Sequence, residues 1–158
     1  MAKLAFIATC AALLFLSFAA RAQGTGDVPK AAYEPELARA LGADDNGMKR
    51  YVLVILKTGP NKVPAGPERD EMFKGHFANM NRLATEGKLV QAGPLDGVDG
   101  WRGLFVFATP DIEEAKKLVA SDPVVMKGEM VPEFHKYYGS SALMLMNDLH
   151  EKVSKKKM

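Results

Sequence analysis

The side chains in this sequence that could carry acid-base chemistry are its three histidines and the carboxylates around them. His76 is the most informative, because it lies three residues after Phe73 and four before Met80, on a stripe that is otherwise apolar. An ionisable ring on such a stripe costs free energy unless a polar partner satisfies it. A histidine held by a partner can act as a general base near neutral pH and take a proton from a carbon or hydroxyl beside a carbonyl. The residues therefore point to lyase or isomerase chemistry, on condition that His76 has such a partner.

The same residues also have a structural interpretation. A histidine on an apolar face is often a satisfied core residue with no chemical role. Aspartate followed by proline is a favoured start for a helical turn, so Asp122 could merely cap residues 123–127. The spacing alone leaves both interpretations open.

The other histidines are far from His76 in the sequence. His135 and Tyr137 lie on an expected strand, where they could line a pocket or a dimer interface, and His150 is expected to be solvated on a terminal helix. Histidines scattered so widely, without a cluster of carboxylates, predict no metal site. We expect no cofactor.

The elements that must position these residues are organised around residues 50–57, which read Arg-Tyr-Val-Leu-Val-Ile-Leu-Lys. The β-branched and aromatic residues favour a strand, and Gly59-Pro60 ends it. Apolar side chains alternate onto both faces, so neither face suits water. Such a strand needs a cover on each side.

The rest of the chain supplies helices and strands in a recognisable order. We expect helices at 68–86 and 111–120 and strands at 88–92 and 101–108, followed by an edge strand that contains Pro132 within 126–136. Residues 58–67 form a Gly/Pro-rich loop, which is either a binding lid or a plain connector. This order predicts an α+β, ferredoxin-like βαββαβ fold with both helices on one side of the sheet. The other side would be left apolar, which predicts a homodimer packed sheet against sheet.

The composition fits one domain with appendages, since the 158 residues are 47% hydrophobic and 25% charged. Residues 1–22 have the layout of a signal peptide, with Lys3, an apolar run, and a small-residue cleavage pattern before Gln23. A transmembrane anchor, or a lipoprotein modified at Cys10, is the alternative. We expect cleavage near Ala22 and a periplasmic or secreted protein with no membrane attachment in its mature form.

The mature chain would contain no cysteine, so it would have no disulfide and no thiolate nucleophile. Removal of Lys3 and Arg21 would bring the formal net charge from +2 to zero, which gives nucleic acid no electrostatic attraction. Residues 23–47 form a leader with a short helix at 34–41, and residues 140–158 form a C-terminal extension. That extension could dock on another protein.

Several stretches, taken in order, resemble the YciI-like (YCII-related) domain family over residues 48–139. They are Tyr51-Val52-Leu53-Val54, the helical His76, residues 87–94 (Gly-Lys-Leu-Val-Gln-Ala-Gly-Pro), Glu113-Glu114-Ala115 and Ser121-Asp122-Pro123. The resemblance implies a dimeric α/β barrel of ferredoxin-like subunits. It also implies that His76 and Asp122 form a His-Asp dyad facing a pocket.

If Asp122 accepts a hydrogen bond from one ring nitrogen of His76, the other nitrogen is free to act as the base. Gly93, Pro94, Arg102 and His135 are the candidate substrate-binding residues, with backbone amides near Gly93 and Arg102 as enolate partners. The function expected is that of an exported YciI-like protein of unassigned reaction, with lyase- or isomerase-type chemistry on a small carbonyl or cyclic compound. The alternative is a non-catalytic, dimeric small-molecule-binding or scaffold module.

Overall fold

The computed structural model describes residues 32–155 of the chain. Two compact units divide the chain, Met1–Tyr33 and Glu34–Met158, and the elements below all belong to the second. The expected signal peptide and the first part of the leader lie outside the described residues, so export and cleavage near Ala22 stay predictions. Within residues 32–155, none of the helices combines the length and the apolar character that crossing a membrane requires.

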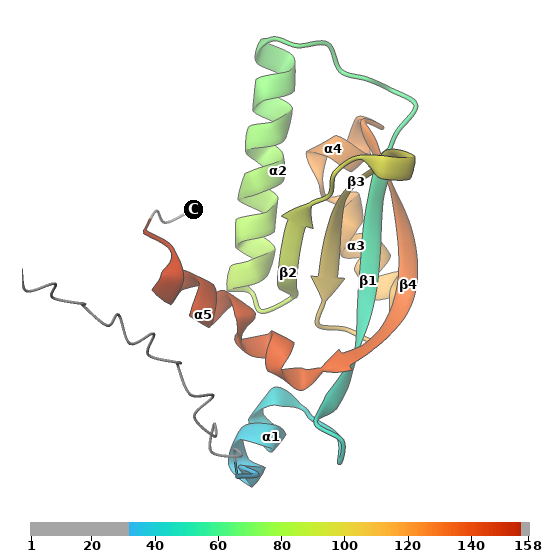
Figure 1. Ribbon diagram of the computed structural model, residues 1–158. Coiled ribbons are helices and arrows are strands. Elements are labelled where there is room, and N and C mark those ends of the chain that lie inside the picture. The colour runs from blue at the N-terminus through green and yellow to red at the C-terminus, as the bar shows by residue number, and fades with distance from the viewer. Residues whose placement is uncertain (1–31, 156–158) are drawn as a thin grey trace, which may run out of the picture. The chain divides into compact units, whose positions relative to one another are not determined.

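The described part of the chain contains one antiparallel sheet with strand order β2-β3-β1-β4 (Figure 1). Its strands are β1 (Met48–Thr58), β2 (Leu89–Pro94), β3 (Trp101–Phe107) and β4 (Met130–Ser140). The stretch singled out in the sequence is β1, which is central and pairs with both β3 and β4. Because β4 is an edge strand, Pro132 is tolerated there without a ladder hydrogen bond.

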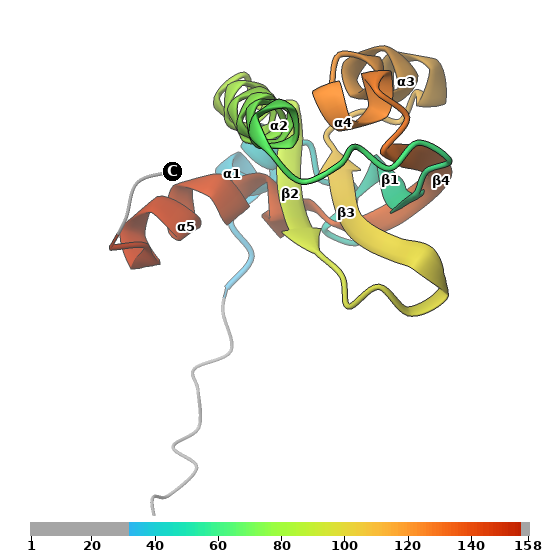
Figure 2. The ribbon, with the colours of Figure 1, turned by 90° about the horizontal axis from the view of Figure 1, so that it is seen from above.

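Three helices cover one side of this sheet, as Figure 2 shows: α2 (Pro67–Thr85), α3 (Ile112–Ala120) and α4 (Pro123–Met126). The order of strands and helices confirms the α+β, ferredoxin-like fold, with α4 as one extra turn before the last strand. Sequence signals explain where the two long helices begin. Pro67 occupies the first turn of α2, and the Asp111 carboxylate accepts a hydrogen bond from the Glu113 amide at the start of α3.

The inner face of the sheet, which carries Val52, Val54 and Phe105, packs against these helices. Val52 and Val54 are fully buried against helix residues that include Leu83 and Val119. Burial of a side chain of this size contributes about 1.5 to 3 kcal/mol of hydrophobic free energy. This inner core fixes α2 against the sheet, beside β2 and α4, and thereby fixes the position of His76.

The outer face, which carries Tyr51, Leu53 and Val106, is partly covered by the C-terminal extension. The C-terminal extension forms a 3₁₀ helix, η2 (Ser141–Leu145), followed by α5 (Met146–Val153). Leu143 and Met144 pack against the cluster formed by Tyr51, Val90 and Val106. The extension therefore covers one end of the face that had been expected to be bare, and the homodimer stays a prediction.

Three strands run further than the sequence suggested, and the first is β1, which begins at Met48 and ends at Thr58. β2 continues through Gly93 and Pro94, where the glycine-proline pair had been expected to end it. A proline is compatible with this position because β2 is the other edge of the sheet. β4 extends to Ser140, and its last residues pair with the start of β1. The short turn η1 (Val98–Gly100) separates β2 from β3.

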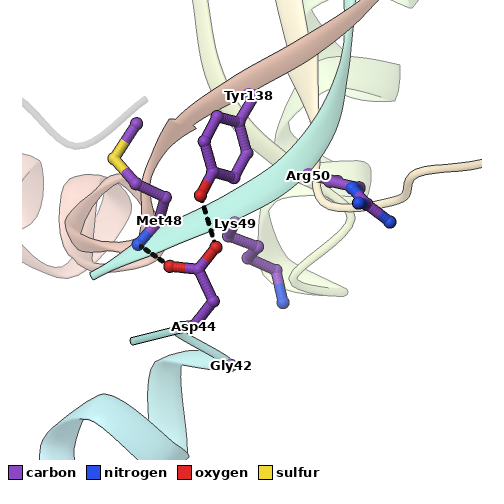
Figure 3. A pocket seen from close by; sticks show the side chains of 6 residues that line it. All are labelled: Gly42, Asp44, Met48, Lys49, Arg50 and Tyr138. Carbon is purple, nitrogen blue, oxygen red and sulfur yellow. Dashed lines mark hydrogen bonds between the residues drawn. The ribbon is translucent and has the colours of Figure 1, made fainter. Parts of the chain in front are cut away.

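The end of the leader is tied to the end of β4. The short helix α1 (Pro35–Leu41) ends at Gly42, which adopts a left-handed conformation with φ 68°. Asp44 then accepts hydrogen bonds from the Met48 amide and the Tyr138 hydroxyl (Figure 3), and a further one from the Asn46 amide. The Ser141 amide donates to the carbonyl of Gly47, so the leader and the C-terminal extension meet at the start of β1.

Candidate functional site

His76 and Asp122 are in direct contact, although they are distant in sequence. Nδ1 of His76 lies 2.9 Å from Oδ1 and 2.8 Å from Oδ2 of Asp122. The Asp122 side chain is fully buried and that of His76 is 10% exposed. An ionised carboxylate only accepts hydrogen bonds, so Nδ1 is the donor, and in the neutral imidazole Nε2 then keeps its lone pair. The carboxylate thus fixes both the tautomer and the orientation of the ring.

Local structure brings the two residues together. Asp122 is the N-cap of α4 and also accepts a hydrogen bond of 3.1 Å from the Val124 amide, so its carboxylate is held in place before it meets the histidine. Gly75 precedes His76 on α2 and faces α4: a Cβ atom there would lie 2.9 Å from Cγ of Pro123. The missing side chain is what lets α2 approach the Asp122-Pro123 turn so closely.

His76 lies on the wall of a cavity of about 590 Å³ between α2 and the inner face of the sheet. Three aromatic rings surround it, those of Phe73, Phe77 and Phe105, with ring centroids 5.4 to 6.1 Å from that of His76. Apolar residues make up most of the remaining wall, among them Leu56, Met80, Leu89 and Met130. A cavity of this size with a few polar groups in an apolar wall is typical of a small-molecule site.

Arg102 supplies a permanent positive charge to the same cavity. Its position follows from an irregularity in the sheet: Leu56 is opposite Gly103 and Lys57 is opposite Trp101, so Arg102 has no partner on β1. A bulge of this kind redirects a side chain. Among the described residues the guanidinium of Arg102 makes no hydrogen bond, and its electrostatic neighbour is Glu129.

Glu129 is itself already paired. The carboxylate is 3% exposed and accepts hydrogen bonds of 2.7 Å from the Val63 amide and from Arg69. Burial alone would raise the pKa of Glu129, but these two donors outweigh it and hold the pKa below its ordinary value. Arg69 also lies over the ring of Phe73, at 4.9 Å from its centroid, and so supports the cavity wall. Arg102 therefore keeps its hydrogen-bonding capacity for a ligand.

The residues predicted from the sequence fall into two groups. His76, Gly93, Pro94 and Arg102 line the cavity, and Asp122 stands directly behind His76. His135 does not: it pairs with Leu53 across the sheet and lies on the outer face, where its Nε2 is 2.8 Å from Oε1 of Glu133. The prediction of a substrate-binding role for His135 in this cavity is not supported by its position.

Sequence reasoning missed two sets of residues that shape the cavity. One is Gly75, whose signal is a glycine in the interior of an otherwise strong helix. The other is the group from α5, namely Met146, Asn147 and His150, which forms part of the wall. Their apolar and polar spacing predicts a helix, but no feature of the sequence indicates where that helix packs.

A second hollow, of about 460 Å³, lies where the leader meets the sheet (Figure 3). Its wall contains Asp44, Lys49, Arg50 and Tyr138 together with Gly42 and Met48. The Tyr138 hydroxyl lowers the pKa of Asp44, helped by the Met48 amide, and Asp44 in turn raises the pKa of Tyr138. Both side chains are exposed, so water competes for this pair. No group of three or more His, Cys, Asp or Glu residues among the described residues could hold a metal ion.

Comparisons with known proteins give a family, and four chains of solved structures match as well. The YCII-related domain matches residues 50–132, which is more than half of the chain. No curated protein matches. Among solved structures, 5-chloro-2-hydroxyhydroquinone dehydrochlorinase from Burkholderia phenoliruptrix AC1100, in complex with 2,5-dihydroxybenzoquinone, is 18% identical with a TM-score of 0.41, over 55% of this chain and 92% of that chain.

Proposed function

This chain belongs to the YCII-related domain family, and from that premise we propose that it is a lyase or isomerase that acts on a small carbonyl or cyclic compound. His76 is the general base and Asp122 is its positioning residue. One observation carries the proposal: Nδ1 of a histidine on the cavity wall is held by both oxygens of a fully buried carboxylate. That arrangement leaves Nε2 as the proton acceptor.

The reaction class follows from what one base can do in an apolar cavity. Nε2 takes a proton from a carbon beside the substrate's carbonyl group, and the electron pair of the broken C–H bond moves into an enolate. In an isomerase the imidazolium returns the proton to another carbon. In a lyase the enolate expels a leaving group, which takes its bonding electrons with it. Asp122 stabilises the imidazolium in both cases.

The surroundings of His76 support this chemistry. The rings of Phe73, Phe77 and Phe105 give His76 apolar neighbours, and interactions between charges are stronger beside an apolar wall than in water. Arg102 brings positive charge to the cavity, where an enolate would develop. A single general base contributes about 10²- to 10⁴-fold in rate, so orientation and charge stabilisation would have to supply the rest.

A non-catalytic binding or scaffold module is the second candidate. The observation that favours it is the bond from the Val124 amide to Asp122, since capping alone would explain a buried aspartate at this position. On this alternative the His76–Asp122 bond only stabilises the packing of α2 on α4.

A proton-exchange assay separates the two candidates. Cyclic ketones, enols and hydroxylated aromatic compounds are incubated with the protein in D₂O, and deuterium incorporation beside the carbonyl is followed by NMR. His76→Gln keeps a donor toward Asp122 but removes the base, so exchange should fall by about 10²- to 10⁴-fold. The control is His135→Gln, which changes a histidine on the outer face and should leave exchange unaltered. Equal rates of deuterium exchange in the parent and in His76→Gln, with every compound tested, would contradict the enzymatic proposal.

We also propose that the protein is exported to the periplasm or beyond and acts as a homodimer. Export rests on the signal-peptide layout of residues 1–22. The dimer rests on the outer face, where Trp101 and Val131, at the end of the sheet away from η2, are 41% and 46% exposed and Tyr137 is 37% exposed. Light scattering at micromolar concentration tests the dimer, and sequencing the N-terminus of the exported protein tests cleavage near Ala22. A stable single subunit would contradict the dimer.

A further inference from the structure

One end of the His76 cavity is built by residues that lie outside the family match. Met146, Asn147 and His150 on α5 belong to its wall, whereas the match ends at residue 132. The opposite end carries Arg102, Gly103 and Met130. The C-terminal extension is therefore part of the cavity, although the sequence suggested either a solvated tail or a docking segment.

The extension is held on both faces of the sheet near the edge strand β2. On the outer face, Leu143 and Met144 of η2 pack against Tyr51, Val90 and Val106. On the cavity side, Nδ2 of Asn147 donates a hydrogen bond of 2.8 Å to the carbonyl of Leu89 on β2. Figure 1 shows the consequence, with α5 lying beside the end of α2 and the start of β2. The apolar packing of η2 and the hydrogen bond of Asn147 together hold α5 in place on the wall of the cavity.

Among the described residues, Arg102 carries the one permanent charge on the cavity wall. No aspartate or glutamate among them lines the cavity. The imidazole of His150 is exposed at the rim and makes no hydrogen bond to any described residue. The cavity therefore favours a ligand that carries negative charge on an apolar body.

The distance between the two ends sets the shape of that ligand. Residues of α2 from Phe73 to Ala84 line the cavity, and at 1.5 Å per residue this span is about 16 Å. Arg102 lies toward the Phe73 end, since its electrostatic neighbour Glu129 is bonded to Arg69 in the first turns of α2. Met146 and His150 lie toward the Ala84 end, since α5 is bonded to Leu89 just after α2. A ligand that used both ends would be elongated.

We propose that the C-terminal segment 141–153 is the specificity wall of this cavity, and that the cavity takes an elongated organic anion. The carboxylate or enolate is held by Arg102, the apolar body passes His76, and the far end meets Met146 and His150. The inference rests on the proposed function only in taking this cavity as the substrate site. Segment 141–153 then decides which members of an anion series fit.

A series of aromatic probes tests this, with binding measured by chemical-shift changes in the intact protein. The probes are benzoate, which is short, biphenyl-4-carboxylate, which is long, and the neutral amide of each. The parent protein should bind each carboxylate more tightly than its amide and the long carboxylate more tightly than the short one. Arg102→Gln should weaken both carboxylates about ten- to hundredfold and leave the amides unchanged. The matched control is Arg50→Gln in the second hollow.

The far end is tested by separate variants. His150→Ala changes an exposed side chain, so the fold should persist, and it should weaken the long carboxylate several-fold without affecting benzoate. Asn147→Ala, which removes the bond to Leu89, should act in the same direction. His135→Ala, on the outer face, should affect neither probe.

Three results would overturn the inference. They are equal binding of carboxylates and amides by the parent, an unchanged length preference in both α5 variants, and the absence of shifts at cavity residues with any probe. Binding is measured without turnover, so its failure is distinguishable from failure of the proposed chemistry. If proton exchange is absent but the probes bind in the expected pattern, the proposed catalytic function is contradicted and the proposed role of segment 141–153 is supported.

Discussion

Asp122 and Asp44 each accept a hydrogen bond from a ring-bearing side chain, and the surroundings of the two carboxylates differ. Asp122 receives Nδ1 of His76 with both oxygens while its side chain is fully buried. Asp44 receives the Tyr138 hydroxyl at the surface, in the hollow of Figure 3. Each aspartate also accepts a bond from a nearby backbone amide. The local geometry is similar, so burial is the variable that separates them.

Burial changes what each hydrogen bond contributes. Water can replace Tyr138 as the partner of Asp44, so loss of that bond leaves no unsatisfied group. Water cannot reach Asp122 or the Nδ1 side of His76, so each depends on the other. A buried pair therefore holds an imidazole in one orientation, which a base requires, whereas an exposed pair mainly organises a loop.

The largest effect is expected from Asp122→Ala. The change leaves Nδ1 of His76 and the Val124 amide without partners in a dry environment, which should lower the free energy of unfolding by on the order of 3 kcal/mol. Urea denaturation measures this. Asp44→Ala is the matched control and should shift the midpoint far less, because solvent replaces its bonds. Equal shifts for the two variants would remove the distinction between the pairs.

The second effect concerns the close approach that allows the buried pair to form. Gly75→Ala should destabilise the protein by about 1 to 3 kcal/mol, because the new methyl group would meet Pro123 at 2.9 Å even though alanine is the better helix former. It should also reduce proton exchange by His76. The double variant Gly75→Ala/Pro123→Ala should recover part of the loss, since the clash is with the proline ring. Additive effects in this cycle would show that the contact is unimportant.

Both the buried pair and the fold could be anticipated in part from the sequence. The central strand, the two long helices and the Asp122 cap follow from apolar spacing, glycine and proline positions, and capping residues, all of which act locally. For His135 the sequence left a pocket and a dimer interface open, because a strand exposes alternate residues on opposite faces and the sequence does not state which face β4 turns to the helices. Arg102 reaches the cavity through a bulge, which no local pattern reveals.

The C-terminal extension illustrates the limit of local reasoning. Leu143 and Met144 belong to a short apolar stretch without a clear period, and their partners Tyr51 and Val106 are far away in the chain. The identification of α5 as an amphipathic helix could be made from spacing alone. Its packing against β2 depends on the Asn147 bond to Leu89, which is a tertiary contact.

The third effect is the loss of stability as the pH falls, for which a buried and an exposed glutamate are compared. The pKa of Glu129 is lowered in the folded protein, so its contribution to stability is complete above the ordinary glutamate pKa of 4.5 and is lost as the pH drops through the folded value. Glu129→Gln should therefore lose less stability between pH 5 and pH 3 than the parent does, in denaturation series at each pH. Glu68→Gln, at an exposed pair with Lys127, should change this slope much less. Parallel slopes for the parent and Glu129→Gln would contradict the assignment.

The smallest effect is expected at the exposed pair itself and is visible only in its titration. The Tyr138 hydroxyl is the main cause of the lowered pKa of Asp44, so Tyr138→Phe should raise that pKa toward the ordinary aspartate value. Conversely, Asp44→Asn should lower the raised pKa of Tyr138. Carboxyl and phenol NMR titrations follow both groups, while denaturation midpoints should hardly move. A midpoint shift as large as that of Asp122→Ala would mean that the bond between Tyr138 and Asp44 is protected from water. Burial would then no longer explain why only the His76–Asp122 pair can hold a catalytic base.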